Sequence, residues 1–172
     1  HVHLCICWTS QEYLDFVALP SLCDSIWRFY SIWGALSLNL RIYLFHYPSQ
    51  RSRETLKYFT EVVERFKSFM ERFAGKDIAE RDLRAAMEVY DENRRLLKSL
   101  YELRKKESPP ISGVEALEVV LSSMTTPKLL HNRLLKKLLG EIEEREEYPK
   151  SDVRLLVSGH VIEDTDVLRV IE

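Results

Sequence analysis

The chain has 172 residues, enough to bury one substantial core or parts of two. Its 45% hydrophobic and 30% charged residues are typical of a globular protein, and its net charge of −2 argues against a nucleic-acid-binding surface, which normally carries a basic excess. Three cysteines are too few for a disulfide framework, and no stretch resembles a secretory signal or a membrane span, so we expect a cytoplasmic protein.

The first seven residues alternate strictly between the two faces of an expected strand. One face carries His1, His3, Cys5 and Cys7, and a His-x-His pair on a strand can offer two imidazoles to zinc. Four alternate positions spread over about 20 Å, which is too far for one ion, and cysteine also serves as a small hydrophobic residue. A half-buried strand is therefore the preferred interpretation, and a zinc site is the alternative.

The next segment reads as a strand, a proline stop and a polar turn that opens a helix. Phe16–Leu19 has the length and composition of a buried parallel strand, and Pro20 ends it because proline cannot donate to the ladder. Asp24 or Ser25 can cap the amphipathic helix that follows. Cys23 would then lie just beyond the carboxyl end of a strand and beside a helix N-terminus, where open α/β folds bind ligands and a helix dipole stabilises a thiolate.

A second β-rich run, Leu40–Phe45, ends at His46 and the turn that follows it. Two strands with a helix between them form a crossover unit, so we expect a parallel sheet. His46 would lie at the carboxyl end of its strand, on the same edge as Cys23, and can line a cleft there. A structural hydrogen-bonding role is the preferred interpretation for a histidine at a strand end, and the cleft-lining role is the alternative.

From residue 51 the hydrophobic period becomes helical. A helix is predicted over residues 51–73, starting near Ser52 and stopping at Gly75. A longer one is predicted from about residue 78 to 106, where a Pro-Pro pair stops it. Its apolar stripe is expected to face the core and consists of Leu83, Met87, Tyr90, Leu97 and Tyr101.

Two more helices are predicted before residue 150. The first spans residues 114–123, with Glu115 in its first turn, where a carboxylate suits the helix dipole. The second starts at Thr126-Pro127 and contains the polar pair His131-Asn132. Its inward face is expected to consist of Leu130, Leu134, Leu135, Leu138 and Leu139.

The end of the sequence repeats the strand–turn–helix pattern. A β-rich run over residues 152–158 breaks into the turn Ser158-Gly159, and Asp164 can cap a closing helix over residues 167–171. We therefore expect an α/β fold, with a parallel sheet at the start, a helical region in the middle and the start of a second α/β unit at the end.

Seven short motifs, taken in order, resemble the D-component family of 2-hydroxyacyl-CoA dehydratases and the related benzoyl-CoA reductase subunits. No single motif is strong, but their order and spacing match over residues 15–172. They are Leu19–Ser25, His46–Pro48, Tyr90–Leu97, Leu100–Arg104, Pro109–Glu115, His131-Asn132 and Arg154–Gly159.

The resemblance implies subunits with two Rossmann-like α/β domains joined by helices. Residues 1–50 would then be the end of the first domain, carrying Cys23, residues 51–150 the helical connector, and residues 151–172 the first strand–helix unit of the second domain. It also implies a [4Fe–4S] cluster held by three cysteines, the second of which corresponds to Cys23. The residues expected to line the cleft are Asp24, Ser25, His46, Ser158 and Gly159, whereas no catalytic residue is assigned.

The reaction implied by the resemblance starts from a CoA thioester. The open iron site of the family takes water or the thioester carbonyl, an ATP-dependent activator protein delivers one electron, and the resulting ketyl radical allows syn elimination of water. In the reductases the same chemistry reduces a ring. A second homologous subunit is the expected partner, and neither nucleic acid nor a membrane is expected.

The sequence also departs from the family pattern. Cys5 and Cys7 precede Cys23 too closely to be the usual upstream ligand, and the region that carries the third ligand is absent. We therefore expect the chain to be the middle of a longer subunit that neither assembles the normal cluster nor turns over alone. The alternatives are a scaffold or interaction protein derived from the family, and a zinc-binding module at the first seven residues.

Overall fold

The computed structural model describes residues 14–35, 41–143, 153–158, 162 and 164–172. These residues form a mixed, mostly helical α/β structure with one two-stranded parallel sheet, which confirms the expected class. The chain divides into two compact units, His1–Ile78 and Ala79–Glu172, here called the first unit and the second unit. Within the described ranges, no helix combines the length and the apolar character needed to cross a membrane.

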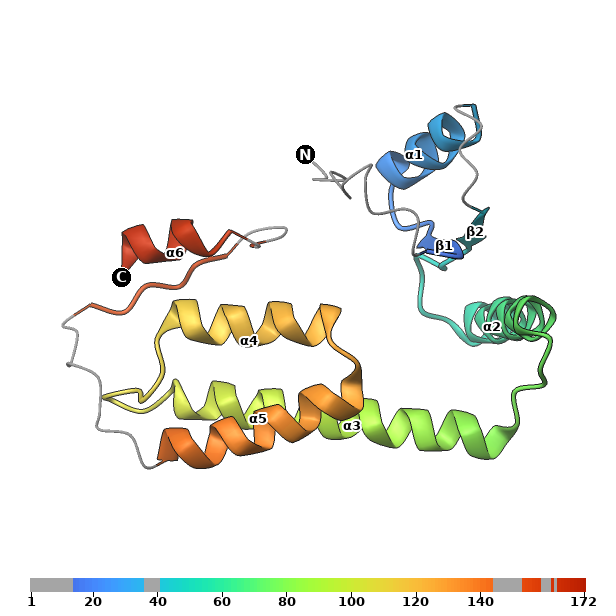
Figure 1. Cartoon of the computed structure of the whole chain (residues 1–172). Helices are drawn as coiled ribbons and strands as arrows, with labels where there is room; N and C mark the ends of the chain where they lie inside the picture. The colour runs from blue at the N-terminus through green and yellow to red at the C-terminus, as the bar shows by residue number, and fades with distance from the viewer. Residues whose placement is uncertain (1–13, 36–40, 144–152, 159–161, 163) are drawn as a thin grey trace. The chain divides into compact units, whose positions relative to one another are not determined.

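The sheet of the first unit is the parallel crossover that the sequence predicts. Strand β1 (Phe16–Pro20) leads through α1 (Asp24–Ala35) to strand β2 (Arg41–Phe45), as Figure 1 shows. The two strands pair in parallel, with Phe16 opposite Arg41 and Pro20 opposite Phe45. Both strands therefore end at the same edge, so the residues that follow them are brought together.

Helix α2 (Arg53–Ala74) has the capped ends that its sequence predicts. The Ser52 hydroxyl accepts from the Thr55 backbone N–H at 3.2 Å, and the Thr55 hydroxyl accepts from the Ser52 N–H at 2.7 Å. Gly75 ends the helix with φ 63°, a left-handed conformation that glycine adopts without steric cost.

An aromatic cluster joins α2 to the sheet. Phe69 is its centre: its ring lies 5.3 Å from that of Phe16 in β1 and 4.6 Å from that of Tyr43 in β2, measured between centroids. Phe66 adds contacts to Tyr43 and Phe45 at 5.0 and 5.6 Å. These edge-to-face and tilted pairs pack half-buried rings of α2 against one face of the small sheet, so the first unit is held together by aromatic contacts of its own.

The second unit is built from helices α3 (Glu80–Leu103), α4 (Gly113–Thr125), α5 (Lys128–Glu143) and α6 (Thr165–Ile171). Helix α3 packs against α5 and α4, and α6 packs against α4 (Figure 1). The Ser112 side chain caps α4 by accepting from the Glu115 N–H at 3.0 Å. The buried hydrophobic cluster consists of Leu100, Ile111, Ala116 and Ile142.

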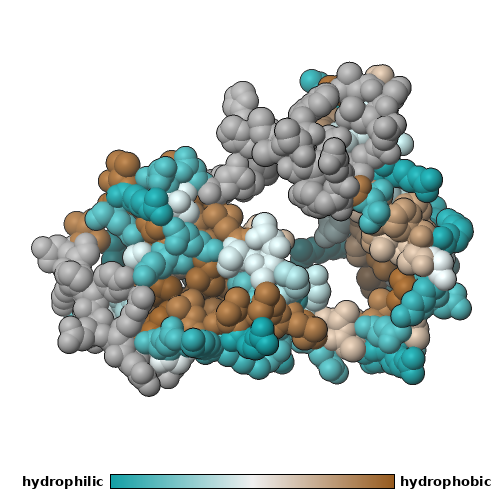
Figure 2. All heavy atoms as spheres, in the orientation of Figure 1, coloured by the Kyte–Doolittle hydropathy of each residue, from teal (hydrophilic) through white to brown (hydrophobic). Residues whose placement is uncertain are grey.

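The predicted inward stripe of α3 is wrong for most of its residues. Met87 is 63% exposed and Tyr90 is 49% exposed, whereas the buried residues of α3 are Asn93 and Leu100. The hydrophobic spacing predicts the position of the helix in the sequence correctly. It does not predict which face of the helix is buried, because the polar residue Asn93 occupies the centre of that face. Leu134 of α5, which was also expected to face inward, is 53% exposed. Figure 2 shows hydrophobic residues gathered on the surface of this helical region.

The predicted strand near the C-terminus is absent from its described part. Residues 153–158 have no regular secondary structure and pair with no strand among the described residues. A strand is stabilised by its neighbours, so an apolar run alone does not form one. Arg154 instead donates to the carbonyls of Lys105, Lys106 and Glu107, in the turn that follows α3.

The closing helix α6 is confirmed, together with its predicted cap. The Asp164 carboxylate accepts from the Asp166 N–H at 2.9 Å. Farther along, the Glu172 carboxylate accepts from the backbone N–H groups of Gly113 and Val114, the first two residues of α4. An anion at a helix N-terminus is favourable, so the charge of Glu172 helps to join α6 to α4.

Candidate functional site

Cys23 lies where β1 ends and α1 begins, as the sequence predicts. It is a free and exposed cysteine. Its backbone carbonyl accepts from the N–H groups of Ile26 and Trp27 at 3.1 and 3.5 Å, so Cys23 takes part in the first turn of the helix. The thiol therefore stands at the carboxyl edge of a parallel sheet, accessible to a ligand and close to a helix N-terminus.

The two polar residues after Cys23 lie inside the helix. Asp24 is the first residue of α1 and Ser25 is the second, and both are exposed. They are therefore one and two residues too far along the chain to precede the helix as the predicted cap. The Asp24 carboxylate still suits the positive end of the helix dipole, in the first turn.

His46 lies directly after β2, at the same sheet edge as Cys23. It is exposed, and its ring centroid lies 5.6 Å from that of Trp27 in α1, at an interplanar angle of 45°. The ring contact fixes His46 against the helix that Cys23 opens. The structure thus brings Cys23 and His46 to one edge of one sheet, while their roles there stay a prediction.

Ser21 is the residue of this edge that sequence reasoning missed. Its backbone N–H donates to the carbonyl of Phe45 at 2.8 Å, and its hydroxyl accepts from the N–H of Tyr47 at 3.2 Å. One serine therefore links the two strand ends through both its backbone and its side chain. Ser21 lies within the motif Leu19–Ser25, but it precedes the helix by three positions, which is not a capping position, so the sequence near it does not predict its bond to Tyr47.

The remaining predicted site residues belong to the second unit. Ser158 is exposed and lies at the end of the irregular segment 153–158. Gly159 lies outside the described residues, and so do His1, His3, Cys5 and Cys7, so the zinc alternative stays a prediction.

The described residues can offer an iron–sulfur cluster one thiolate. Within the ranges that the structure describes, no three His, Cys, Asp or Glu side chains converge as a metal-binding group. Cys23 alone has the chemistry and exposure of a cluster ligand there, because clusters are held by cysteine thiolates. The described residues therefore fit one corner of a cluster and not a complete set of ligands.

A second polar cluster is buried between α3, α4 and α5. Asn93 is 3% exposed and His131 is 4% exposed. The Asn132 amide donates to the carbonyl of Val89 at 2.9 Å and to the Glu92 carboxylate at 3.1 Å, so its oxygen faces Asn93. Asn93 must therefore present its nitrogen, which donates to Asn132 at 2.7 Å.

The hydrogen bonds of this cluster determine which ring nitrogen of His131 carries the hydrogen. The second hydrogen of the Asn93 amide points to Nδ1 of His131 at 2.7 Å, so Nδ1 must accept and carry no proton. Nε2 then carries the proton and donates toward the Val119 carbonyl and the Ser122 hydroxyl, both at 3.3 Å. These bonds use the side chains of the cluster to hold helices together, so we assign it a structural role.

The rim of this cluster carries one charged pair between helices. Nζ of Lys136 in α5 lies 2.5 Å from Oε1 of Glu92 in α3. The hydrogen bond from Lys136 lowers the pKa of Glu92, burial opposes the shift, and the positive charge of Lys136 and the Asn132 amide support it. Protonation of Glu92 is therefore expected to weaken its pairing with Lys136 across the two helices.

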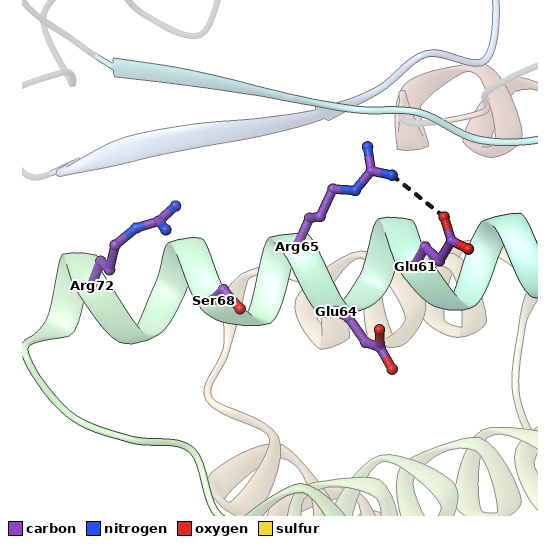
Figure 3. A pocket seen from close by; sticks show the side chains of 5 residues that line it. All are labelled: Glu61, Glu64, Arg65, Ser68 and Arg72. Atoms are coloured by element: carbon purple, nitrogen blue, oxygen red, sulfur yellow. Dashed lines mark hydrogen bonds and ion pairs between the residues drawn. The ribbon is translucent and has the colours of Figure 1, made fainter.

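A shallow hollow on α2 is made from the side chains of a single helix. Figure 3 shows its lining, in which Arg65 pairs with Glu61 at 3.4 Å. Both side chains of this pair are exposed, and such surface pairs contribute little free energy. The hollow therefore offers no convergent set of groups for a ligand. Its lining consists of Glu61, Glu64, Arg65, Ser68 and Arg72.

The relatives found by comparison with known proteins are named as subunits of a CoA reductase or of CoA dehydratases. The chain is 25% identical over 155 residues to a benzoyl-CoA reductase subunit of Thauera aromatica, covering 89% of this chain and 40% of the relative. It is 23% identical to the (R)-phenyllactyl-CoA dehydratase beta subunit of Clostridium sporogenes, covering 94% of this chain and 43% of the relative. Against the lactoyl-CoA dehydratase subunit beta of Anaerotignum propionicum the identity is 24%, covering 95% of this chain and 43% of the relative.

The chain spans about two fifths of the length of these curated relatives. The model of the family described as 2-hydroxyglutaryl-CoA dehydratase, D-component, matches residues 6–172, which is nearly the whole chain. The resemblance inferred from the ordered motifs is thereby confirmed. This chain belongs to the 2-hydroxyglutaryl-CoA dehydratase D-component family, and a benzoyl-CoA reductase subunit is among its relatives.

Proposed function

We propose that this chain forms part of an iron–sulfur subunit of a 2-hydroxyacyl-CoA dehydratase or a related benzoyl-CoA reductase, with Cys23 as one cluster ligand. Family membership supports the enzyme class, since the relatives are named for reactions of CoA thioesters. The observation that carries the role of Cys23 is its exposed thiol at the carboxyl edge of the parallel sheet, two residues after the bridging serine.

Two residues at this edge would have different roles in binding the cluster. Cys23 would hold iron as a thiolate, and His46, fixed against Trp27, would line the space beside it. The bound cluster supplies one-electron transfer and an open iron position that polarises a carbonyl oxygen. The further ligands of the [4Fe–4S] group would come from Cys5, Cys7, other sequence of the subunit or a second chain.

The proposal extends to the fold and the partners of the complete enzyme. Residues 1–50 would close a first Rossmann-like domain and residues 151–172 would open a second, joined by the helical connector over 51–150. The expected partners are a CoA-thioester substrate, a second homologous subunit and an ATP-dependent activator protein. In this scheme Cys23 would help to hold the cluster at the carboxyl edge of the sheet, and the cluster would supply the electron transfer needed for elimination of water or for ring reduction.

Replacing Cys23 with alanine tests the proposal. In the natural protein that carries this sequence, purified anaerobically, we expect C23A to lose most of its iron and acid-labile sulfide per chain, because an iron without its thiolate is released. Ser31→Ala is the matched control: it removes an exposed hydroxyl that bonds the α1 backbone at Trp27 and should leave the iron content unchanged.

Each result of this measurement has a clear meaning. Equal iron in C23A and the parent protein would contradict the assignment of Cys23 as a ligand. A parent protein that holds no iron or sulfide would favour the alternative, a non-catalytic scaffold derived from the family. Zinc retained in place of iron would favour a metal site at the first seven residues.

A further inference from the structure

The turn between β1 and α1 is tied to the neighbouring strand by one residue. Ser21 continues the ladder by one step beyond Pro20, because its N–H donates to the carbonyl of Phe45 at 2.8 Å. Its hydroxyl then reaches the N–H of Tyr47, 26 residues later in the chain, at 3.2 Å. Ser21 is half-buried, whereas Leu22 and Cys23, which follow it, are exposed.

The turn itself is tight on both sides of the thiol. The Leu22 N–H donates back to the carbonyl of Pro20 at 2.8 Å, which closes a three-residue turn around Ser21. One residue later the carbonyl of Cys23 accepts from the Ile26 N–H at 3.1 Å and opens α1. Cys23 therefore lies between a turn that is hydrogen-bonded to the end of β2 and the first turn of a helix. Its position depends on the hydrogen bonds that Ser21 makes to Phe45 and Tyr47.

The partner of the serine hydroxyl is itself fixed. The ring of Tyr47 contacts that of Phe59 in α2 with centroids 5.3 Å apart and planes at 71°. The hydroxyl thus joins the β1–α1 turn to the segment that enters α2. Loss of the hydroxyl would leave the Tyr47 N–H without this acceptor and would leave the turn held by backbone bonds alone.

We propose that Ser21 is a positioning residue for the Cys23 thiol. Its hydroxyl holds the β1–α1 turn against the β2–α2 connection and so fixes the direction of the thiol before any ligand binds. Groups that orient a metal ligand without touching the metal are worth roughly 10–100-fold in affinity. The inference rests on the proposed function for what the thiol binds, but the restraint itself is a property of the chain without a ligand.

The restraint is measured with a nitroxide spin label attached to Cys23 in the natural protein without metal, after replacing Cys5, Cys7 and any other cysteine of that protein with serine. We expect Ser21→Ala to narrow the electron paramagnetic resonance lines, which reports a more mobile label, and to speed amide hydrogen exchange at Tyr47. Ser21→Thr retains the hydroxyl and should restore both readouts. Ser31→Ala loses an exposed hydroxyl bond elsewhere in α1 and should change neither. Unchanged lines and unchanged Tyr47 exchange in S21A would overturn the proposal.

The consequence for metal binding is measured separately in the natural holoprotein with all cysteines present. We expect S21A to release iron to a chelator about tenfold faster than the parent protein, and S21T to release it at the parental rate. If C23A keeps its iron, the proposed function fails while the mobility result still stands. If C23A loses its iron but S21A releases it at the parental rate, the positioning role fails.

Discussion

Asn93 is the residue on which the polar interior of the second unit depends. Its amide donates to both His131 and Asn132, at 2.7 Å each, and all three side chains are buried. Asn93→Ala would leave an unpaired nitrogen and an unpaired oxygen in the interior. Because buried polar groups without partners carry a desolvation penalty, we expect a loss of about 2–4 kcal/mol in the free energy of unfolding, measured by urea denaturation.

A matched variant separates this effect from a general loss of helix stability. Ser99 is on the same helix, is exposed, and bonds the Arg95 carbonyl at 3.2 Å. Ser99→Ala should therefore change the free energy of unfolding by less than about 0.5 kcal/mol. A similar small loss for N93A, at an unchanged denaturant slope, would show that water replaces the missing amide and that the network is not essential.

At the scale of elements, the local signals predicted the first unit well. Phe16–Leu19, the proline after it and the run ending at Phe45 were sufficient to predict a parallel crossover, since two strands separated by one helix favour that topology. The ends of α2 are predictable because Ser52 and Gly75 cap the helix through residues in the adjacent turn. Such features depend on residues a few positions apart, which a sequence displays directly.

Contacts between distant residues account for what the sequence did not predict. Asn93 bonds residues 38 and 39 positions away, so nothing near it in the chain marks it as the centre of a buried face. The Ser21–Tyr47 hydrogen bond at the candidate site joins residues 26 positions apart, so the residues near Ser21 do not predict it either. The apolar run over 152–158 has the composition of a strand, but β-propensity reports suitability for a sheet and not the presence of a neighbouring strand.

The ion pair between α3 and α5 predicts how acid acts on the second unit. The hydrogen bond from Lys136 lowers the pKa of Glu92 below its ordinary value of 4.5. A carboxyl group whose pKa is lower in the folded state contributes stability above its unfolded value and loses it as the pH falls through the folded value. We expect Lys136→Met to make the decline of unfolding free energy below about pH 4.5 less steep, measured by urea denaturation across a pH series.

Lys137 provides the control for this series. It is the next residue of α5 and is paired with Glu141 of its own helix at 3.6 Å, so it makes no link to α3. Lys137→Met removes the same charge without touching Glu92 and should keep the parental pH dependence. An identical change of slope in both variants would indicate a general charge effect rather than the Glu92–Lys136 pair.

At the scale of the whole molecule, each unit has a core made from its own elements. The first unit is held by aromatic rings of α2 against the sheet, and the second by the cluster around Leu100 together with the buried amide network. The sheet edge that carries Ser21, Cys23 and His46 belongs to the first of these units. Changes in the helical unit should therefore alter stability without altering the sheet edge that carries Cys23.

The independence of the two cores is tested by a pair of variants read by hydrogen–deuterium exchange. Phe69→Ala removes the ring at the centre of the aromatic cluster and should destabilise the first unit by about 2 kcal/mol, speeding exchange in β1 and β2 but not in α3 to α5. N93A should produce the reverse pattern. Tyr58→Ala, which removes an exposed ring from α2, is the control and should leave both patterns unchanged. Faster exchange of both units in either F69A or N93A would mean that they unfold together, and the sheet edge would then depend on the helical unit for its stability.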